Sequence, residues 1–225
     1  MKKLLSLILI AAISLSTLFV GSIGVGAVKK PKAPKKVKVT GQYYFINTIA
    51  VDVNTVKNKA IKGYEVTGTA KGVKKLKAYA PQYYYLKKTG ADLKNIKNNV
   101  FYKIRARSYI KKNGKKIYSK YSKATYACNA VVLKEFSIDN HSLKWDSVNG
   151  AQKYDISASF NRNAKKYTKI STTKNTSCEI TKIGNTKIEK GMSFYVKIIA
   201  KKNVGSKTYS SDKNYVSVCY VPDYV

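Results

Sequence analysis

The side chains that most enzymes use for catalysis are scarce in this sequence. His141 is the only histidine, and 11 acidic residues stand against 44 lysines and arginines in 225 residues. A Ser/His/Asp nucleophile would have to use His141, which lies in the run Asp139-Asn140-His141-Ser142. Asp, Asn and Ser favour turns for backbone reasons, so this run predicts a turn. The sequence offers no catalytic candidate, and we expect the protein not to be an enzyme.

Metal and cofactor sites are not expected either. A zinc site needs several Cys or His ligands at close spacing, whereas Cys128, Cys178 and Cys219 are separated by 50 and 41 residues. No glycine-rich phosphate loop is present. The thiols leave two alternatives: three reduced and mostly buried side chains, or an intermolecular disulfide through an exposed strand-end cysteine. Cys178 is in phase with Ile180 and is expected to face a core, where a free Cys behaves as a small hydrophobe.

Positive charge is the chemistry that this sequence has in excess, with a formal net charge of +33. Residues 28–128 hold 26 basic and 3 acidic residues, and residues 129–225 hold 16 and 8. Such a field concentrates polyanions, and lysines act as mobile point charges without stereochemical selectivity. We therefore expect attachment to extracellular polyanions such as wall teichoic acid or acidic polysaccharide, with only non-specific binding of nucleic acid. The alternative is a structural spacer or a module that binds a protein partner, in which the lysines only maintain solubility and block edge strands.

Clustered tyrosines offer a second kind of surface. In Tyr43-Tyr44 and Tyr83-Tyr84-Tyr85 the side chains of a strand alternate between faces, so at least one ring of each cluster is expected to be exposed. Exposed rings can stack on sugars. The interpretation that we favour from the sequence is that these rings fill the interior and its margin.

The elements that position these residues are repeated strands. Gly63 to Val66 aligns with Lys153 to Ile156, Lys103 to Ala106 with Lys197 to Ala200, and Tyr118 with Tyr209, at offsets near 90 residues. A unit of about 90 residues is therefore used twice. Apolar residues alternate with polar ones along short runs that Gly and Asn interrupt, which is typical of an antiparallel sandwich.

The two copies resemble the fibronectin type III domain. The second copy carries the resemblance best, in Leu143-Lys144-Trp145-Asp146, Tyr154-Asp155-Ile156, Phe194 to Ala200 and Tyr209-Ser210-Ser211. The resemblance implies an all-β fold of two tandem fibronectin type III-like, or immunoglobulin-like, antiparallel sandwiches. It also implies adhesion, spacing or carbohydrate-associated roles, among which the fold alone does not choose.

Two departures from the family pattern concern the core. Val53 in the first copy occupies the place of Trp145 in the second, so tyrosines are expected to fill that core. The family usually has a corner tyrosine six residues before the alanine of its sixth strand, and Val100 and Phe194 stand at these positions. The resemblance therefore predicts corners without the usual hydroxyl bond.

The chain is expected to divide into four parts. Residues 1–27 are predicted to be a signal peptide, because Met1-Lys2-Lys3 precedes an apolar run and Val25-Gly26-Ala27 ends in small residues. An uncleaved anchor is the alternative, since the run approaches the roughly 18 residues that span a bilayer. Residues 28–34 form a Lys/Pro-rich leader, and the two domains cover 35–128 and 129–225. Because of the predicted signal peptide we expect the protein to be secreted or associated with the cell surface, and the mature chain has no predicted transmembrane segment.

The predicted binding face lies in the first domain. Tyr102, Ile104 and Ala106 are expected to face the core, so the alternate residues project together from the opposite face of the strand. A preceding strand and the hairpin around Asn113-Gly114 extend the same sheet with lysines. The equivalent row of the second domain is interrupted by Ile199 and is expected to be weaker. The predicted polyanion-binding residues are Lys103, Arg105, Arg107, Lys74, Lys75, Lys77, Lys111, Lys112, Lys115 and Lys116.

Overall fold

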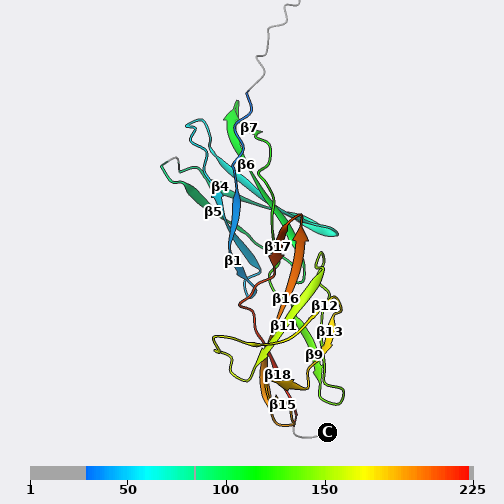
Figure 1. Ribbon diagram of the computed structural model, residues 1–225. Coiled ribbons are helices and arrows are strands. Elements are labelled where there is room, and N and C mark those ends of the chain that lie inside the picture. Colours follow the sequence, from blue (N-terminus) through cyan, green and yellow to red (C-terminus); the bar gives the residue numbers. More distant parts are fainter. Residues whose placement is uncertain (1–28, 84, 223–225) are drawn as a thin grey trace, which may run out of the picture. The chain divides into compact units, whose positions relative to one another are not determined.

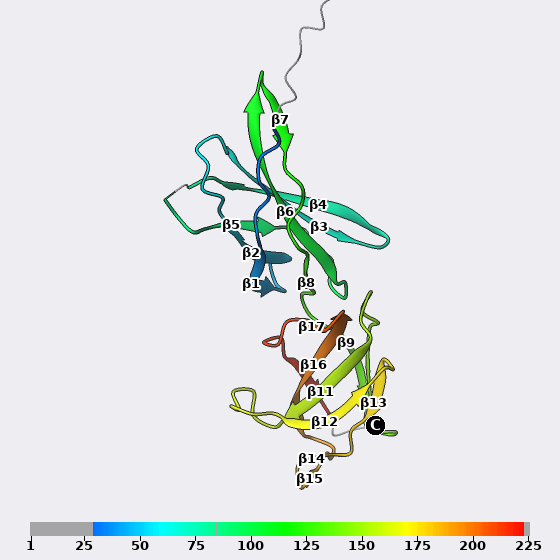
Figure 2. The ribbon, with the colours of Figure 1, turned by 45° about the horizontal axis from the view of Figure 1, so that its top comes forward.

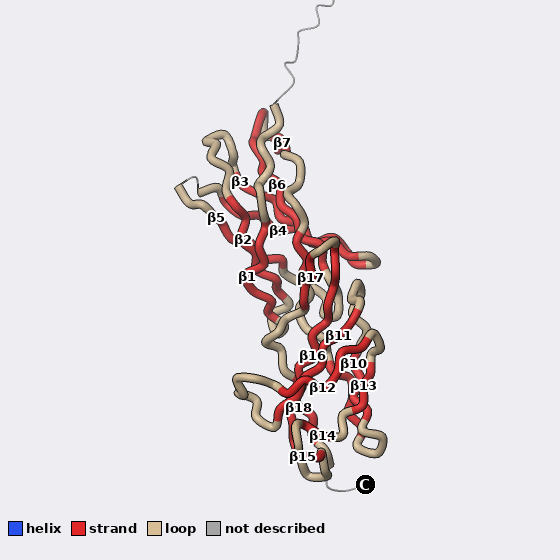
Figure 3. The backbone as a smooth tube through the Cα atoms, in the orientation of Figure 1, coloured by secondary structure: helices blue, strands red, loops and turns tan. Residues whose placement is uncertain are grey.

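The computed structural model describes residues 29–83 and 85–222, and every regular element in them is a β-strand (Figure 3). The described residues from Pro31 onward form one compact unit. The predicted signal peptide lies outside the described residues and stays a prediction. In the described part of the chain, no helix is long and apolar enough to cross a membrane.

The first sandwich consists of two antiparallel sheets (Figures 1 and 2). One sheet has the order β1-β2-β5, and the other has the order β4-β3-β6-β7, with β8 also paired to β6. The first sheet contains β1 (Val37–Tyr43), β2 (Thr48–Asn54) and β5 (Lys88–Leu93). The second contains β3 (Gly63–Ala70), β4 (Val73–Pro81), β6 (Tyr102–Lys112), β7 (Lys115–Tyr118) and β8 (Thr125–Ala127).

The second sandwich repeats this arrangement. Its three-stranded sheet has the order β13-β10-β9, and its larger sheet has the order β12-β11-β16-β17, with β18 paired to β16. The first of these contains β9 (Leu133–Ser137), β10 (Ser142–Trp145) and β13 (Ser177–Glu179). The larger sheet contains β11 (Lys153–Ser159), β12 (Thr168–Thr173), β16 (Ser193–Val204), β17 (Lys207–Ser210) and β18 (Ser217–Tyr220). A short hairpin joins β14 (Lys182–Ile183) to β15 (Thr186–Lys187).

The expected fold class is confirmed: the protein is all-β, with two fibronectin type III-like antiparallel sandwiches. Each sandwich pairs its first, second and fifth strands in one sheet and its third, fourth, sixth and seventh strands in the other, if the β14–β15 hairpin is set aside. The division at residues 128 and 129 stays a prediction. Cys128 and Phe101 pack with the core of the second sandwich, and Pro31 and Pro34 of the predicted leader are buried.

Tyrosines fill the interior where the first sandwich lacks a tryptophan. Val53, Tyr64 and Tyr102 are fully buried there, whereas Trp145 packs edge-on against Tyr154 in the second core, with ring centroids 5.4 Å apart. The hydroxyl oxygen of Tyr64 accepts a hydrogen bond from the backbone N–H of Val56 at 2.7 Å. Buried tyrosines thus carry both packing and a polar contact that a phenylalanine could not make.

A tyrosine corner is present in the first sandwich, which corrects the expectation from the sequence. The hydroxyl of Tyr102 accepts a hydrogen bond from the backbone N–H of Lys97 at 2.9 Å, five residues upstream. The corner residue is therefore Tyr102, two positions after Val100. Desolvation raises the pKa of Tyr102 above its ordinary value, and the hydrogen bond from Lys97 acts in the opposite direction. In the second sandwich, β16 carries Phe194 at the equivalent position, as expected, and Phe194 has no hydroxyl.

The three cysteines are reduced and pack in or against the second core. Cys128 and Cys219 are buried, and Cys178 is half-buried on β13. Burial raises the pKa of Cys128 and of Cys219 to about 12, and that of Cys178 to about 11. The alternative of an exposed strand-end cysteine is therefore wrong for Cys128 and Cys219, because neither sulfur is accessible to a partner.

Two local predictions have different outcomes. His141 lies in the turn between β9 and β10 with a φ of 51°, as the Asp-Asn-His-Ser run predicts. The predicted equivalence of Tyr118 and Tyr209 is wrong. Ser119 accepts from the N–H of Ser108 at 3.0 Å, and Ser211 accepts from the N–H of the equivalent Ala200 at 3.1 Å. Tyr118 pairs with Tyr109, and Ser210 pairs with Lys201, so the two hairpins align Tyr118 with Ser210, at an offset of 92 residues.

Candidate functional site

The predicted row on β6 alternates as expected but is not freely exposed. Tyr102, Ile104 and Ala106 are fully buried, while Lys103, Arg105 and Arg107 lie on the opposite face and are only half-exposed. The expectation that all three cations are solvent-facing is therefore wrong. The reason is a layer of aromatic side chains that covers this face of the sheet.

Arg107 is held by a buried carboxylate. Its Nε and Nη2 atoms each lie 2.8 Å from Oε1 of Glu65, which stands directly opposite on β3 and is only 1% exposed. The hydroxyls of Tyr79 and Tyr121 also donate to the Glu65 carboxylate, at 3.3 and 3.4 Å. Arg107 therefore compensates an internal negative charge and has little capacity left for an external anion.

Aromatic rings and cations alternate across this face, and we call them the tyrosine–cation layer. The Arg107 guanidinium lies 3.7 Å from the ring centroid of Tyr118, and Arg105 lies 4.5 Å from that of Tyr121. The Lys116 ammonium lies 4.1 Å from the ring of Tyr79 and 4.7 Å from that of Tyr109. Cation–π contacts of this kind hold each charge over a ring face. The members are Tyr79, Tyr109, Tyr118, Tyr121, Arg105, Arg107 and Lys116.

The hairpin between β6 and β7 has the predicted turn. Asn113 and Gly114 both have positive φ, 49° and 72°, which the two central residues of a type I′ turn require. The register places two pairs of lysines directly opposite one another, Lys111 with Lys116 and Lys112 with Lys115. Lys111, Lys112 and Lys115 are exposed and have no ion pair among the described residues.

A concentration of free positive charge lies at the β4 edge of the sheet. Lys74, Lys75 and Lys77 line an open hollow of about 740 Å³, together with Lys94 and Lys97 from the segment after β5. All five are exposed or nearly so, and Asp92 is the only carboxylate in the lining. None of the five takes part in an ion pair within the described residues. We call this feature the lysine hollow.

Lys94 and Lys97 are the site residues that the sequence reasoning missed. Neither lysine has a basic neighbour in the sequence. Only the folding of β5 beside β4 brings them to the three lysines of the β4 edge. The structure therefore divides the ten predicted residues into three groups. Arg105, Arg107 and Lys116 belong to the tyrosine–cation layer, Lys74, Lys75 and Lys77 to the lysine hollow, and Lys111, Lys112 and Lys115 to the hairpin, with Lys103 at the end of the layer.

The second sandwich keeps a reduced form of the same arrangement. Ile199 stands opposite Asp155 as Arg107 stands opposite Glu65, and the Asp155 carboxylate is instead paired with Lys201, at 3.2 Å. Desolvation acts to raise the pKa of Asp155, but hydrogen bonds from Lys201 and Thr172 outweigh it, and the pKa lies below its ordinary value. Lys197 lies 4.2 Å from the ring of Tyr167. The two cations of the expected row on β16, Lys197 and Lys201, therefore also make contacts within the sandwich.

The tyrosine clusters are exposed, contrary to the favoured interpretation. Tyr43 is 48% exposed and Tyr85 is 77% exposed, so these rings do not fill a core. Tyr84 lies outside the described residues. Tyr44 is half-buried and packs on Tyr215, with ring centroids 4.5 Å apart. The described residues contain no group of three or more His, Cys, Asp and Glu side chains that could hold a metal ion.

Comparisons with known proteins give little beyond the fold. No protein-family model matches the chain, and no curated protein matches it. Among solved structures, it is similar to the chicken CNTN1 FN1-FN3 domains, at 12% sequence identity and a TM-score of 0.28. That match covers 85% of this chain and 66% of the other, slightly less than two thirds of its length.

The fold and the surface together define a class of protein. The fibronectin type III-like fold by itself does not assign a function, so the function has to be argued from the surface. The sheets of this chain hold their internal carboxylates in ion pairs, at Glu65 and at Asp155. Exposed lysines without an ion pair among the described residues gather at two edges of the first sandwich, the lysine hollow and the β6–β7 hairpin.

Proposed function

We propose that the protein is a secreted or surface-associated, non-catalytic module that attaches to extracellular polyanions through its first sandwich. The observation that carries the proposal is the lysine hollow, where five ammonium groups face one carboxylate. Like charges held this close repel one another. A bound polyanion offsets that repulsion, and the electrostatic free energy of the lysine hollow is therefore lower when the polyanion is bound.

The ligand class follows from the kind of cation. Lysine presents a compact ammonium on a flexible stem, without the planar fork with which arginine recognises a particular anion geometry. Both arginines of β6 are engaged in the tyrosine–cation layer. A polymer with regularly spaced anions, such as wall teichoic acid or an acidic polysaccharide, suits this surface, and nucleic acid would bind only through its backbone charge. The ten residues predicted from the sequence contribute through their free lysines, mainly Lys74, Lys75 and Lys77.

The test compares two triple variants of equal charge. One variant replaces Lys74, Lys75 and Lys77 with Gln. The other replaces three exposed lysines of the second sandwich, Lys182, Lys187 and Lys190, with Gln. Binding to purified wall teichoic acid and to alginate is measured over a salt series. Three exposed charge contacts contribute about 1–3 kcal/mol together, so the first variant should bind about tenfold more weakly at low salt. Affinity of the parent should fall steeply towards physiological salt, where screening acts over about 8 Å.

The outcomes separate the proposal from its alternative. If both triple variants lose the same affinity, net charge alone drives the binding and the lysine hollow is not a site. If the parent binds neither polymer at low salt, the charge serves solubility, and the spacer or protein-partner alternative holds. Adding Lys94→Gln and Lys97→Gln to the first variant should weaken binding further, because these two lysines line the same hollow.

A further inference from the structure

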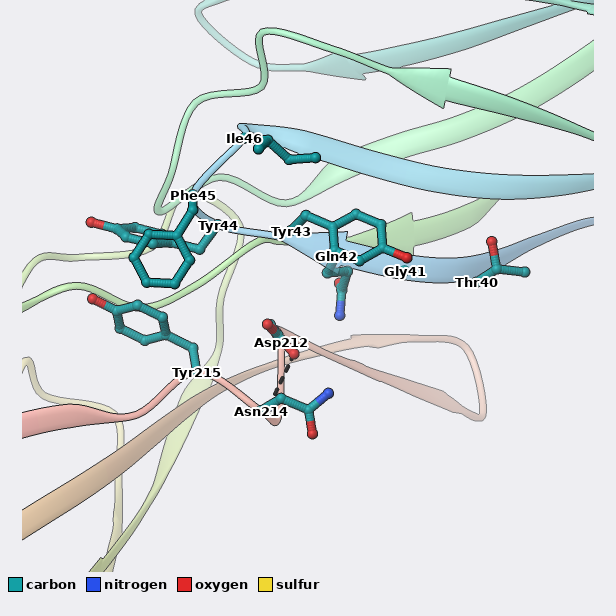
Figure 4. Close-up of a pocket in the computed structure, with 10 residues that line it drawn as sticks. All are labelled: Thr40, Gly41, Gln42, Tyr43, Tyr44, Phe45, Ile46, Asp212, Asn214 and Tyr215. Atoms are coloured by element: carbon teal, nitrogen blue, oxygen red, sulfur yellow. Dashed lines mark hydrogen bonds between the residues drawn. The ribbon is translucent and has the colours of Figure 1, made fainter. Parts of the chain in front are cut away.

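An aromatic pocket lies apart from the lysine hollow, and its chemistry is different. It has a volume of about 560 Å³, and none of its lining residues is Lys or Arg, although the chain has 44 of them. One wall is the end of β1 with the turn that follows it, and the other is the loop between β17 and β18 (Figure 4). The lining residues are Thr40, Gly41, Gln42, Tyr43, Tyr44, Phe45, Ile46, Asp212, Asn214 and Tyr215.

Aromatic rings form the apolar part of this pocket. Phe45 is 89% exposed and Tyr43 48%, while Tyr44 contacts both Phe45 and Tyr215, with centroid distances of 5.3 and 4.5 Å. The ring of Tyr43 folds back over Gly41, as Figure 4 shows. A Cβ atom at Gly41 would stand 2.5 Å from three atoms of that ring. The glycine therefore provides the space in which the Tyr43 ring rests.

Polar groups face these rings from the opposite wall. The backbone N–H of Asn214 donates to Oδ1 of Asp212 at 3.0 Å, which fixes the carboxylate in the loop and leaves its second oxygen without a hydrogen bond in the described residues. Desolvation raises the pKa of Asp212, and the Asn214 N–H acts in the opposite direction. Gln42 and Asn214 add amide donors and acceptors close to the carboxylate (Figure 4).

The two walls are held together by Asn129. Its side chain is fully buried, and its Nδ2 donates to the backbone carbonyl of Tyr43 at 3.1 Å. The backbone carbonyl of Asn129 accepts a hydrogen bond from the backbone N–H of Asp212 at 2.7 Å. One residue thus fixes the backbone on both sides of the pocket, so the rings and the carboxylate are in place before a ligand arrives.

We propose that this pocket binds a neutral sugar unit of an extracellular glycan, with its C–H face on the rings of Tyr43 and Phe45 and its hydroxyls on Asp212 and Asn214. A sugar ring has one apolar face and several hydroxyls, which matches a pocket of aromatic rings with a few convergent polar groups. Asp212 repels an anionic ligand locally. The net charge of +33 repels a cationic one at longer range. A neutral ligand meets neither obstacle.

The experiment titrates the whole mature protein with three neutral oligosaccharides, cellotetraose, maltotetraose and tetra-N-acetylchitotetraose, by calorimetry and by saturation transfer from protein to sugar. At least one should bind saturably, with an affinity that does not change between low and high salt. Phe45→Ala removes an exposed ring and should weaken binding about five- to tenfold, the value of one aromatic contact. Gly41→Ala removes no side-chain contact but displaces the Tyr43 ring, and it should weaken binding by a similar factor.

Tyr85→Ala is the matched control, because Tyr85 is also an exposed aromatic residue and lies outside the pocket. It should bind the sugar like the parent, and circular dichroism should show all three variants folded. The proposal is wrong if none of the three sugars binds, or if Tyr85→Ala weakens binding as much as Phe45→Ala does. Tighter binding of tetramethylammonium chloride than of any sugar would also overturn it, because the pocket would then recognise a cation. None of these outcomes depends on polyanion binding, which the salt series measures separately.

Discussion

Replacing Arg107 by Gln tests whether the tyrosine–cation layer is structural. The change removes the guanidinium whose two nitrogens lie 2.8 Å from Oε1 of Glu65. The carboxylate then keeps only the hydroxyls of Tyr79 and Tyr121, at 3.3 and 3.4 Å. Because Glu65 is 1% exposed, water cannot replace the lost partner.

The expected loss of stability follows from this burial. Removing one partner of a buried ion pair costs about 3–5 kcal/mol. The Arg107 side chain is 25% exposed, and two hydroxyl donors remain, so we expect the lower end, about 3 kcal/mol. Domains of this size are stable by about 5–15 kcal/mol. With a slope of about 1–3 kcal/mol per molar urea, the midpoint for the first sandwich should fall by about 1–3 M.

The assay is urea unfolding followed by two signals. Far-UV circular dichroism reports on both sandwiches, while the fluorescence of Trp145, the only tryptophan, reports on the second core. Lys201→Gln is the control, because Lys201 also forms an ion pair with a carboxylate of its sheet, and this partner, Asp155, has a side chain 39% exposed. An ion pair with an exposed partner contributes at most about 1 kcal/mol, so this control should move the tryptophan transition only slightly.

Two results would refute the reasoning. Arg107→Gln could cost no more than Lys201→Gln, in which case the burial of Glu65 carries no electrostatic penalty. Alternatively, the double variant Arg107→Gln with Glu65→Gln could be as unstable as the single variant. We expect the double variant to recover most of the loss, because no buried charge then remains without a partner.

Three further predictions concern single groups. With pKa values raised to about 12, the thiols of Cys128 and Cys219 should resist iodoacetamide at pH 8 and react once urea unfolds the chain, because only about one in 10,000 is ionised at that pH. Tyr102→Phe should lower the unfolding free energy of the first sandwich by about 1–2 kcal/mol in urea titrations, since the Lys97 N–H loses its acceptor. The lowered pKa of Asp155 adds stability above about pH 4 that is lost as the pH falls through the folded-state value. Asp155→Asn should therefore flatten the acid side of the pH profile recorded by tryptophan fluorescence.

Periodicity predicted the fold well because apolar and polar residues alternate along each strand, according to which face of the sheet they occupy. The alternation at Tyr102, Ile104 and Ala106 and the Asn113-Gly114 turn are local patterns, and the structure confirms both. The state of Arg107 was not predictable in this way, because its partner lies 42 residues away on β3. The membership of Lys94 and Lys97 in the hollow depends likewise on strands that approach only in the folded chain.

The paired lysines of the β6–β7 hairpin affect how copies of this protein meet. A strand at the edge of a sheet offers unpaired backbone groups to any other strand, and edge lysines are a common protection. Here β7 and β4 are the two edges of one sheet, and both carry rows of lysines. Edge-to-edge pairing of two copies would bring these rows together, and the like charges of the lysines would repel one another. Salt or a polymer that neutralises the rows lowers this barrier, so crowding on an anionic surface would favour lateral association of neighbouring molecules.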